Sequence, residues 1–427
     1  MKVLVVGSGG REHALAWKIS QSSLVDELYC IPGNGGTEQI ATNVPIDPSN
    51  IVELSEYVLE KKIDFTVVGP ELPLTLGIVD EFESKGSKIF GPNKKASELE
   101  GSKVFAKEFM TRHKIPTAKY KIGNSAEEAL EIVTSKKSSF PLVIKADGLA
   151  AGKGAIICHN LEEAEKTINL MMAEKKFGQA GERVVIEEFL TGKEVSFIVI
   201  TDGKRILPLV TTMDYKKVYD GNKGPNTGGL GAISPSPFVD SHTFQIIIDK
   251  IIFPTISGML EEGRKFKGVL YAGLILTKDG PKVLEFNCRF GDPETQPQVL
   301  RLESDLLEIL LATYHENLLE KEIKWSEKPS GCVALTSEGY PGKYQTGKVI
   351  TGLDKVASLE KIVLFHAGTK FSNGQLVTNG GRVLGVCSTD STLAEAMENI
   401  YQAISFINFE GMHYRKDIGR EESPGEK

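Results

Sequence analysis

Three polar side chains stand at alternate positions in one short segment of the chain. Glu285, Asn287 and Arg289 belong to the run VLEFNCRFGDPE, which covers residues 283–294. Residues two apart on a β-strand point to the same face, so we expect these three side chains to lie in a row. A carboxylate and an amide oxygen suit Mg²⁺, which completes its ligands with water and phosphate oxygens, and a guanidinium binds a carboxylate or phosphoryl group bidentately. The alternative is a plain polar sheet face, which the neighbouring loop RFGDPE disfavours.

A second candidate is a lysine at the end of an apolar strand. Lys145 ends the run PLVIK, residues 141–145, where a buried ammonium is costly unless it meets an anion. The glycine-rich loop AAGKG, residues 150–154, follows closely, and its backbone N–H groups could fold over phosphates. The sequence lacks the pattern GxxxxGK[ST], so this is not a P-loop, and an ordinary hairpin is the alternative.

Two adjacent acidic residues end another predicted strand. Glu187 and Glu188 stand in VVIEEFL, residues 184–190, which is followed by TGKE with Glu194 as its last residue. Backbone N–H and C=O groups at such a strand end could bind adenine, and the carboxylate of Glu194 could bind ribose hydroxyls. The alternative is a solvated strand end.

The N-terminal loop invites comparison with dinucleotide-binding enzymes. The strand KVLVV, residues 2–6, runs into GSGGREH, but Glu12 stands where the fingerprint G-x-G-x-x-G needs its third glycine. The next predicted strand ends in IPGN, without the acid that would bind a ribose hydroxyl. An NAD-dependent oxidoreductase is therefore disfavoured. What remains is a helix N-terminus whose free N–H groups favour an anion such as phosphate, with plain βα turns as the alternative.

These candidates need elements to position them, and the first hundred residues predict a doubly wound parallel sheet. Short apolar runs end on glycine loops and alternate with helical patterns. In such a sheet, ligands bind at the carboxyl ends of the strands. The predicted strands cover residues 2–6, 28–31, 65–68 and 88–90.

The pattern changes at Gly101, and the rest of the chain predicts mixed α+β structure. We divide the chain into an N-terminal domain over residues 1–102, a central domain over 103–328 and a C-terminal α+β domain over 329–427. The C-terminal domain is predicted to hold short strands and a helix at 392–405. The central domain is predicted to hold helices at 103–113, 125–136 and 241–263, antiparallel strands at 141–146 and 155–158, further strands at 184–190, 195–200, 206–211, 269–276 and 282–286, and a long loop at 220–237.

Composition excludes several classes of protein. Hydrophobic residues make up 41% and charged residues 25% of the 427, which indicates a folded chain and excludes disordered and collagen-like ones. The net charge of −7 argues against a nucleic-acid backbone or an anionic membrane as the main partner. The five cysteines lack C-x-x-C spacing, and no apolar run reaches the ~18 residues of a membrane span. We therefore expect a cytoplasmic protein without disulfides.

The ordered set of these motifs resembles the ATP-grasp superfamily of carboxylate–amine ligases. The set comprises Lys103, Lys145, the AAGKG loop, EEFL and the ExNxR run. The segments GSGGREH, FPLVIKADGLAAGKG, PNTGGLGAISPSP and EFNCRFGDPETQ are similar to one family within it, whose members join glycine to 5-phosphoribosylamine. This similarity extends from residue 1 to about 420.

For the fold and for ATP, the resemblance implies a Rossmann-like N-terminal domain, a two-lobe ATP-grasp core with a mobile lid at about residues 118–190, and a small C-terminal domain. It implies ATP as co-substrate and Mg²⁺ or Mn²⁺ held by Glu285 and Asn287, with Arg289 and Lys145 as catalytic residues. Gly273 stands near the place where many superfamily members have another metal-binding acid. The implied contacts to ATP are Lys103 and Lys145 to the phosphates, Gly152, Lys153 and Gly154 as their cover, Glu187, Phe189 and Leu190 to adenine, and Glu194 to ribose.

For the substrates, the resemblance implies that the glycine carboxylate attacks the γ-phosphorus of ATP to form glycyl phosphate. The nitrogen of 5-phosphoribosylamine then attacks the acyl group, in a step of de novo purine synthesis that releases ADP and phosphate. It implies a monomer that acts on these small molecules without nucleic acid or membrane. The implied substrate contacts are Gly9, Gly10, Pro70, Glu71, Asp214, Pro225, Asn226, Thr227, Gly228, Gly229 and Arg289.

Two other functions and two single residues stay open at this point. The first function is another purine-pathway ATP-grasp ligase with a different acyl donor. The second is a non-catalytic nucleotide-binding regulator, which the presence of Lys145, Glu285 and Arg289 argues against. His13 could touch substrate or could be structural. Cys288 points to the face opposite the metal pair, so we expect it to pack in the core.

Overall fold

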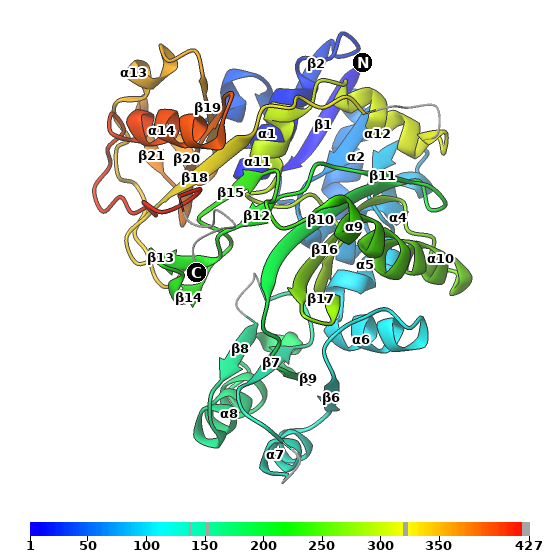
Figure 1. Cartoon of the computed structure of the whole chain (residues 1–427). Helices are drawn as coiled ribbons and strands as arrows, with labels where there is room; N and C mark the ends of the chain where they lie inside the picture. Colours follow the sequence, from blue (N-terminus) through cyan, green and yellow to red (C-terminus); the bar gives the residue numbers. More distant parts are fainter. Residues whose placement is uncertain (136–137, 151–153, 319–322, 421–427) are drawn as a thin grey trace.

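The computed structural model describes residues 1–135, 138–150, 154–318 and 323–420 (Figure 1). Four sheets of four or five strands and two short hairpins organise these residues. A small lobe stands apart from the rest of the molecule at the bottom of Figure 1. The mixed architecture agrees with the predicted fold class.

The first sheet is parallel throughout, in the order β3-β2-β1-β4-β5, which confirms the predicted doubly wound sheet. Its central strand β1 reads KVLVVG and is buried beyond its first residue, because a parallel strand covered on both faces needs apolar side chains on both. The strand order reverses between β1 and β4, so their carboxyl ends open the crevice where such sheets bind ligands. The elements are β1 (Lys2–Gly7), α1 (Gly10–Ile19), β2 (Glu27–Pro32), η1 (Thr37–Gln39), β3 (Thr42–Asn43), α2 (Ile51–Lys61), β4 (Phe65–Val68), α3 (Glu71–Leu76), α4 (Ile78–Ser84), β5 (Ile89–Phe90) and α5 (Lys94–Gly101).

The small lobe is an antiparallel sheet in the order β6-β9-β7-β8 with its own core. Strands β7 and β8 pair antiparallel, as predicted. Helix α7 begins where the side chain of Ser125 accepts the N–H of Glu128, and it shares with α8 a core that includes Ile144 and Ile186. The elements are β6 (Tyr120–Gly123), α7 (Ala126–Thr134), β7 (Leu142–Ala146), β8 (Ala155–Cys158), α8 (Leu161–Ile168), the π-helical turn η2 (Asn169–Ala173), η3 (Gly178–Gly181) and β9 (Val184–Glu188). Helix α6 (Lys103–Arg112) leads into the lobe.

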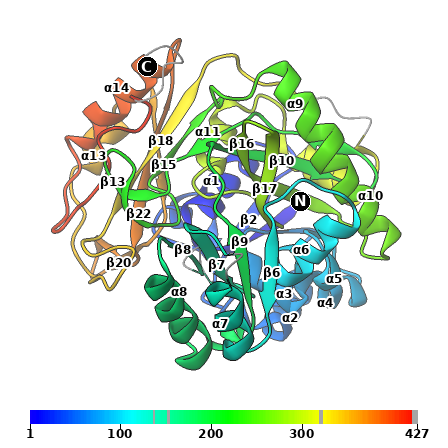
Figure 2. The ribbon, with the colours of Figure 1, turned by 60° about the horizontal axis from the view of Figure 1, so that its bottom comes forward.

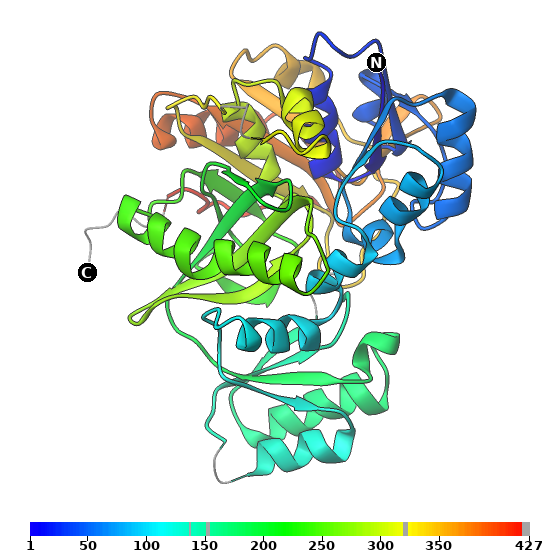
Figure 3. The same cartoon turned by 90° about the vertical axis from the view of Figure 1, so that its right-hand side faces the viewer.

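The third sheet is antiparallel, in the order β11-β10-β16-β17, and a long helix crosses it (Figure 3). By length and composition, the helix from Ser241 to Glu261 is apolar enough to cross a membrane, which the sequence reading did not anticipate. Its Ile247, Ile251 and Ile256 belong to the same core as the sheet, so we interpret it as a core helix. The elements are β10 (Lys193–Thr201), β11 (Ile206–Pro208), α9 (Ser241–Ile247), the π-helical turn η4 (Ile248–Ile252), α10 (Phe253–Glu261), β16 (Gly268–Thr277) and β17 (Gly280–Asn287).

The fourth sheet, in the order β12-β15-β18-β22-β19, corrects the predicted long loop at 220–237. Strand β15, in that segment, is wholly buried and pairs with β18, so that Gly231 lies opposite Val333. A glycine-rich segment has weak strand propensity, and here the distant partner strand determines its structure. The elements are β12 (Met213–Asp214), β13 (Lys217–Tyr219), β14 (Lys223–Asn226), β15 (Gly231–Ser234), α11 (Thr295–Arg301), α12 (Leu306–Tyr314), β18 (Ser330–Thr336), α13 (Leu353–Ala357), β19 (Ile362–His366), β20 (Thr369–Ser372), β21 (Gln375–Thr378), β22 (Arg382–Thr389) and α14 (Leu393–Ile404).

Candidate active site

A cavity of about 730 Å³ opens where these sheets meet. The small lobe, which comes forward in the turned view of Figure 2, contributes Lys145 and Glu187 to its wall. Its wall takes residues from the carboxyl ends of β1, β2 and β4, from α6, from the small lobe and from β16 and β17. Loops on both sides of β20 and β21 complete it. The predicted site residues that line it are Gly9, Pro70, Glu71, Lys103, Lys145, Gly154, Glu187, Asp214, Thr227, Gly228, Glu285, Asn287 and Arg289.

Other predicted site residues do not line this cavity. Gly10 packs against α11, where an added Cβ would lie 2.7 Å from Gln296 Nε2. Pro225 and Asn226 line a neighbouring cavity of about 760 Å³ that shares Ala155 and Tyr340 with the first. Gly152 and Lys153 lie outside the described residues. The cavity lining likewise omits Phe189, Leu190, Glu194 and Gly229.

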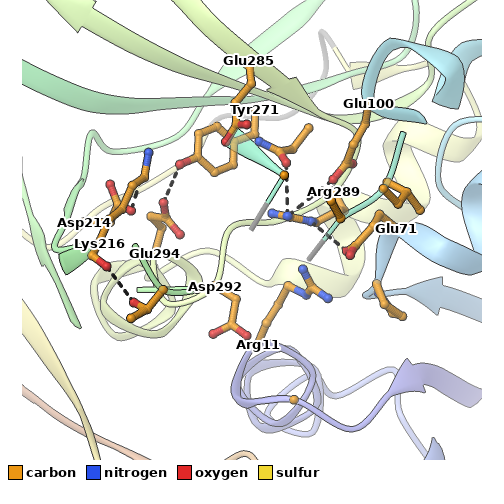
Figure 4. Close-up of a pocket in the computed structure, with 18 of the residues that line it drawn as sticks. Arg11, Glu71, Glu100, Asp214, Lys216, Tyr271, Glu285, Arg289, Asp292 and Glu294 are labelled. Carbon is orange, nitrogen blue, oxygen red and sulfur yellow. Dashed lines mark hydrogen bonds and ion pairs between the residues drawn. The ribbon is translucent and has the colours of Figure 1, made fainter. Parts of the chain in front are cut away.

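The alternating run at the end of β17 does bring its three side chains to the wall of one cavity. Figure 4 shows Glu285 and Arg289 there. Strand β17 ends at Asn287, and the Arg289 guanidinium donates a hydrogen bond to Asn287 Oδ1 at 3.1 Å. The same guanidinium lies 3.3 Å from Glu71 and 3.4 Å from Glu100. Burial opposes its charge, but Glu100 and Glu71 outweigh burial and raise the pKa of Arg289. Its positive charge is therefore fixed in the cavity wall.

Glu285 lines the cavity beside several cations. Burial acts to raise the pKa of this carboxyl, but the nearby cations, foremost Lys216, Lys103 and Lys145, outweigh burial and hold the pKa below its usual range. Glu285 is thus ionised at neutral pH. With the amide oxygen of Asn287 it offers two hard oxygen ligands.

The two oxygen donors of Glu285 and Asn287 fit a cation that takes most of its ligands from water and substrate phosphates. No group of three or more His, Cys, Asp or Glu side chains converges as a metal site among the residues that the structure describes. Gly273 pairs with Glu285, and an added Cβ there would lie 3.3 Å from Glu285 Cγ. Gly273, near the place where the resemblance implies another metal-binding acid in many superfamily members, therefore faces Glu285 but bears no side chain. Mg²⁺, which retains water and binds substrate phosphates, suits such a pair.

Lys145 and Lys107 share one buried carboxylate, that of Glu187. Both Nζ atoms lie 3.1 Å from Glu187 Oε1, and Lys145 also donates to the Leu284 carbonyl at 2.9 Å. Burial lowers the pKa of Lys107 to about 8, while Glu187 acts to raise it. The sequence reading missed Lys107. The available signal was its place one turn after Lys103 on the same helix.

Lys103 begins α6 beside the start of the glycine-rich loop. Its Nζ donates to the Gly148 carbonyl at 3.1 Å. Asp147 accepts hydrogen bonds from the Ser102 hydroxyl at 2.8 Å and the Val104 N–H at 3.0 Å, so it binds the N-terminus of the helix. The first residues of the loop are thereby fixed to α6.

Glu12 occupies the N-terminus of α1, which the sequence reading expected to be free for an anion. Its Oε2 accepts the Gly9 N–H at 2.6 Å, and its Oε1 accepts the Arg11 Nε–H at 2.5 Å. An added Cβ at Gly69 would overlap the Glu12 carboxylate. The Gly9 N–H is therefore not free, and the Glu12 side chain fills the space against Gly69 where a third glycine would let helix and strand pack closely.

Glu71 and Glu100 both pair with Arg289, but the pKa values of their carboxyl groups shift in opposite directions. Burial acts against the charge of Glu71, but Arg289 and Arg11 outweigh it and lower its pKa. Burial dominates at Glu100 and raises its pKa to about 7 despite Arg289. Glu100 Oε2 also accepts the Cys288 N–H at 2.6 Å, and the Cys288 side chain is in the core, as predicted.

The C-terminal part contributes residues that no sequence motif suggested. Arg382 lies 2.7 Å from Asp292 Oδ2 and donates to the Gly228 carbonyl at 2.5 Å. The Gly228 N–H donates to the Tyr340 hydroxyl at 2.9 Å. Tyr340 and Arg382 both line the cavity. Asp292 stands in the loop RFGDPE, residues 289–294, and this loop was the available sequence signal.

His13 proves to be structural. Its Nδ1 accepts the His366 N–H at 2.8 Å, and its ring packs edge-on against Phe365. Burial, together with the nearby His366, lowers the pKa of His13 to about 3, so the ring is neutral. It joins α1 to β19 and does not line the cavity.

The chain matches the phosphoribosylglycinamide synthetase family along its length: the N domain over residues 1–100, the ATP-grasp (A) domain over 101–295 and the C domain over 330–421. The phosphoribosylamine–glycine ligase of Escherichia coli strain K12 is 51% identical over 426 residues, with 98% of each chain covered. That of Caldanaerobacter subterraneus subsp. tengcongensis is 50% identical over 418 residues, covering 98% of this chain and 99% of its own.

Solved structures agree in fold. The crystal structure of phosphoribosylamine–glycine ligase from Thermotoga maritima has a TM-score of 0.84 and 36% identity, over 98% of this chain and all of its own. N5-carboxyaminoimidazole ribonucleotide synthetase from the same organism has a TM-score of 0.62 and 19% identity, over 96% of this chain and 99% of its own, and so shares the fold alone. The matched domains and the near-complete coverage lead to one conclusion: the chain belongs to the phosphoribosylglycinamide synthetase family.

Proposed function

We propose that this chain catalyses the ATP-dependent ligation of glycine to 5-phosphoribosylamine, which gives glycinamide ribonucleotide, ADP and phosphate for purine synthesis. The observation that carries the proposal is the convergence of Lys103, Lys145, Glu285, Asn287 and Arg289 on one cavity in a member of this family. Cations next to hard oxygen ligands suit the transfer of a phosphoryl group, which needs positioning and charge stabilisation more than a protein nucleophile.

The reaction requires activation because a carboxylate is a poor electrophile. A glycine carboxylate oxygen attacks the γ-phosphorus, the bond to the β,γ-bridging oxygen breaks, and ADP leaves. The nitrogen of 5-phosphoribosylamine then attacks the acyl carbon of glycyl phosphate, phosphate leaves, and the nitrogen loses a proton. An acyl phosphate hydrolyses in water, so the cavity must exclude water during this sequence.

We assign Lys145 and Arg289 to the transferring phosphoryl group and Lys103, with the loop Gly152–Gly154, to the phosphates of ATP. Fixed cations that meet developing charge are worth more in a buried site than in water, and both Lys145 and Arg289 are held by carboxylates. We assign the adenine contacts to Glu187, Phe189 and Leu190, at and just after the end of β9. We assign the ribose contact to Glu194, near the start of β10. We assign the two substrates to Gly9, Gly10, Pro70, Glu71, Asp214, Pro225, Asn226, Thr227, Gly228, Gly229 and Arg289.

We assign Mg²⁺ or Mn²⁺ to Glu285 and Asn287. When bound, the ion would neutralise phosphate oxygens and stabilise charge on the phosphoryl group. The support is the ionised state of Glu285, its row with Asn287 and the surrounding lysines, which also attract phosphates.

Release of ADP that depends on both glycine and 5-phosphoribosylamine tests this function. We expect turnover with glycine and none with formate or bicarbonate in its place, and loss of turnover when EDTA removes divalent cations. ADP release with formate or bicarbonate and another ribonucleotide would favour a different ATP-grasp ligase. ATP binding without turnover would favour a nucleotide-binding regulator.

We further propose that the chain acts as a cytoplasmic monomer on small molecules, without nucleic acid or membrane. The net charge of −7 supports the exclusion of polyanionic partners. Our domain division at residues 102 and 328 stays part of the proposal. Light scattering on the purified protein, with and without ATP, measures the oligomeric state.

A further inference from the structure

An arginine near the end of the chain is fully buried but lies outside the cavity wall. The Arg415 side chain is 0% exposed and does not line the cavity. Its Nε and Nη2 donate to the two carboxylate oxygens of Asp417 at 2.7 and 2.6 Å, which is a bidentate ion pair. Its Nη1 donates to the Lys217 carbonyl at 3.2 Å and to Asn222 Oδ1 at 2.9 Å. The guanidinium also lies 5.0 Å from the centre of the Tyr215 ring. A buried charge is costly even when it is paired, and its benefit here is a fixed position for the residues that it contacts.

Most of these contacts go to the hairpin β13–β14 or to the residue just before it. Among the described strands, β13 and β14 pair only with each other and join none of the larger sheets. Two strands alone are marginally stable in water, so the hairpin needs support from outside. The C-terminal segment, residues 413–419, runs along it. The Gly221 N–H donates to Asp417 Oδ2 at 2.8 Å, and His413 Nε2 lies 2.9 Å from the Val218 carbonyl oxygen.

The C-terminal segment is itself anchored to larger elements. The His413 and Thr336 backbones exchange hydrogen bonds of 2.8 and 2.9 Å, at the end of β18. The Tyr401 hydroxyl of α14 accepts the Ile418 N–H at 3.0 Å and donates to the Arg415 carbonyl at 3.2 Å. The segment is therefore fixed to a sheet and to a helix, so that Arg415 holds the hairpin against a rigid frame.

The residues that Arg415 contacts stand on both sides of a lysine of the cavity wall. Lys216 lines the cavity, whereas its neighbour Tyr215 belongs to the core of the fourth sheet, as expected of successive residues in an extended segment. The Lys216 carbonyl accepts the N–H and the hydroxyl of Thr227, each at 2.8 Å, and Thr227 lines the cavity as well. Because Arg415 holds the Tyr215 ring and the Lys217 carbonyl, it fixes the backbone before and after Lys216.

Lys216 in turn pairs with two carboxylates of the proposed site. Its Nζ lies 3.1 Å from Glu194, which we assign to ribose, and 4.0 Å from Asp214, which we assign to the substrates (Figure 4). A displaced backbone at Lys216 would move the ammonium away from both carboxylates and would move Thr227 with it. The geometry of this end of the cavity thus depends on one short stretch of backbone.

We propose that Arg415 is a positioning residue of the active site, which orients Lys216 and Thr227 in the cavity wall through the backbone of the hairpin. This inference rests on the proposed function. It also explains why the position needs an arginine. Two nitrogens of the planar guanidinium bind Asp417 while the third reaches the hairpin, and a lysine has a single nitrogen for all these partners.

Arg415→Lys tests the inference, because it keeps a positive charge near Tyr215 and loses the planar fork. We expect kcat/KM for glycine and for 5-phosphoribosylamine to fall roughly 10- to 100-fold, as for a small displacement of groups that position a substrate. Calorimetry with a non-hydrolysable ATP analogue should show a change in Kd of about twofold or less, because Lys103 and Lys145 have partners of their own. Hydrogen exchange should become faster in peptides from residues 213–231 and stay unchanged in peptides from β1.

A milder variant removes one partner of Arg415 from the hairpin. Asn222 has a φ of 55°, which glycine adopts without strain, so Asn222→Gly deletes the acceptor and keeps the turn. Asn373→Gly is the matched control, because Asn373 has a φ of 49° in the exposed turn of the other hairpin, β20–β21. We expect a smaller fall of both kcat/KM values in Asn222→Gly and none in the control.

These readouts separate positioning from stability, since a residue that only stabilises the fold would lower Tm and leave the constants of the folded protein unchanged. A folded Arg415→Lys variant with unchanged kcat/KM values, with unchanged exchange over residues 213–231, or with an equal loss of affinity for the ATP analogue would overturn the inference. If Arg415→Lys does not fold, Asn222→Gly decides: kcat/KM values below those of Asn373→Gly support the inference, and equal values overturn it. Failure of the proposed function differs from all these outcomes, because the wild type itself would then lack glycine-dependent ADP release.

Discussion

Single residues in this cavity are held by opposite charges before any substrate arrives. Lys145 and Lys107 share Glu187, and Arg289 lies between Glu71 and Glu100. Such pairs keep the cations charged and oriented, so that little reorganisation is needed when a phosphate binds. They also explain how these buried ammonium groups are tolerated.

The shared carboxylate leads to a prediction for Lys145. Lys145→Ala should lower kcat by roughly 10²-fold or more, because it removes a fixed cation from the transferring phosphoryl group. Glu187 keeps Lys107 as its partner, so we expect the variant to fold. Single-turnover ADP formation measures the effect, with Lys166→Ala on the exposed side of α8 as control. Unchanged ADP formation in Lys145→Ala would contradict the assigned role.

The part of the site that depends on local pattern could be predicted from the sequence. Glu285 and Asn287 follow from period two on one strand, and Lys145 from a charge that ends an apolar run. Lys107 stands one turn after Lys103, but a solvated helical lysine has the same spacing, and only the docking of α6 against β9 buries its side chain against Glu187. Arg382 and Tyr340 come from loops far along the chain, and only the tertiary fold brings them to Gly228. The same holds for β15, whose pairing with β18 overrides its weak propensity.

At the scale of elements, α1 has two faces with separate tasks. Its N-cap residue Gly9 and Arg11 in its first turn line the cavity. His13 and Trp17 pack edge-on against Phe365 of β19, and so connect the N-terminal sheet to the fourth sheet. The position of the cavity wall near Gly9 therefore depends on this junction.

The junction makes stability depend on pH. The folded-state pKa of His13, about 3, lies below the ordinary value of 6.5, so between these values the unfolded chain binds a proton that the folded chain excludes. The free energy of unfolding should thus fall as pH falls from about 6.5. In His13→Gln this slope should be smaller by up to about 1.4 kcal/mol per pH unit, the contribution of one proton. Burial lowers the pKa of His366 to about 4, so this residue still makes the free energy of unfolding depend on pH in the His13→Gln variant.

Urea unfolding between pH 7.5 and 4.5 measures these slopes. His242→Gln, at an exposed position of α9, is the control and should match the wild type. A slope in His13→Gln equal to that of the wild type would show that the His13 ring does not exclude the proton.

At the scale of the whole molecule, the fourth sheet joins strands of the matched ATP-grasp domain to strands that follow this domain in the chain. Strands β12 and β15 come before β16 and β17, the last strands of the ATP-grasp domain. Strands β18, β19 and β22 come after them. The cavity is likewise lined by residues from all three matched domains. The C-terminal part is therefore integral to the fold of the preceding residues.

A chain that ends at residue 328 should accordingly lose both structure and function. It would leave β15 without β18 and would remove Tyr340 and Arg382 from the cavity wall. We expect no ligation and no cooperative thermal transition, and partial recovery when residues 329–427 are expressed with it. Full ADP release by the short chain alone would refute this view of the assembly.

The carboxylate of Glu12 has a further consequence for the N-terminal sheet. A group tethered a single turn from its binding place competes at an effective concentration on the order of millimolar or more, whatever the composition of the cell. A free phosphate would have to displace it from Gly9 and also break its pair with Arg11. The N–H of the N-cap residue is thus occupied by the chain itself. A ligand at this edge of the sheet meets the cavity wall formed by Gly9, Pro70 and Glu71.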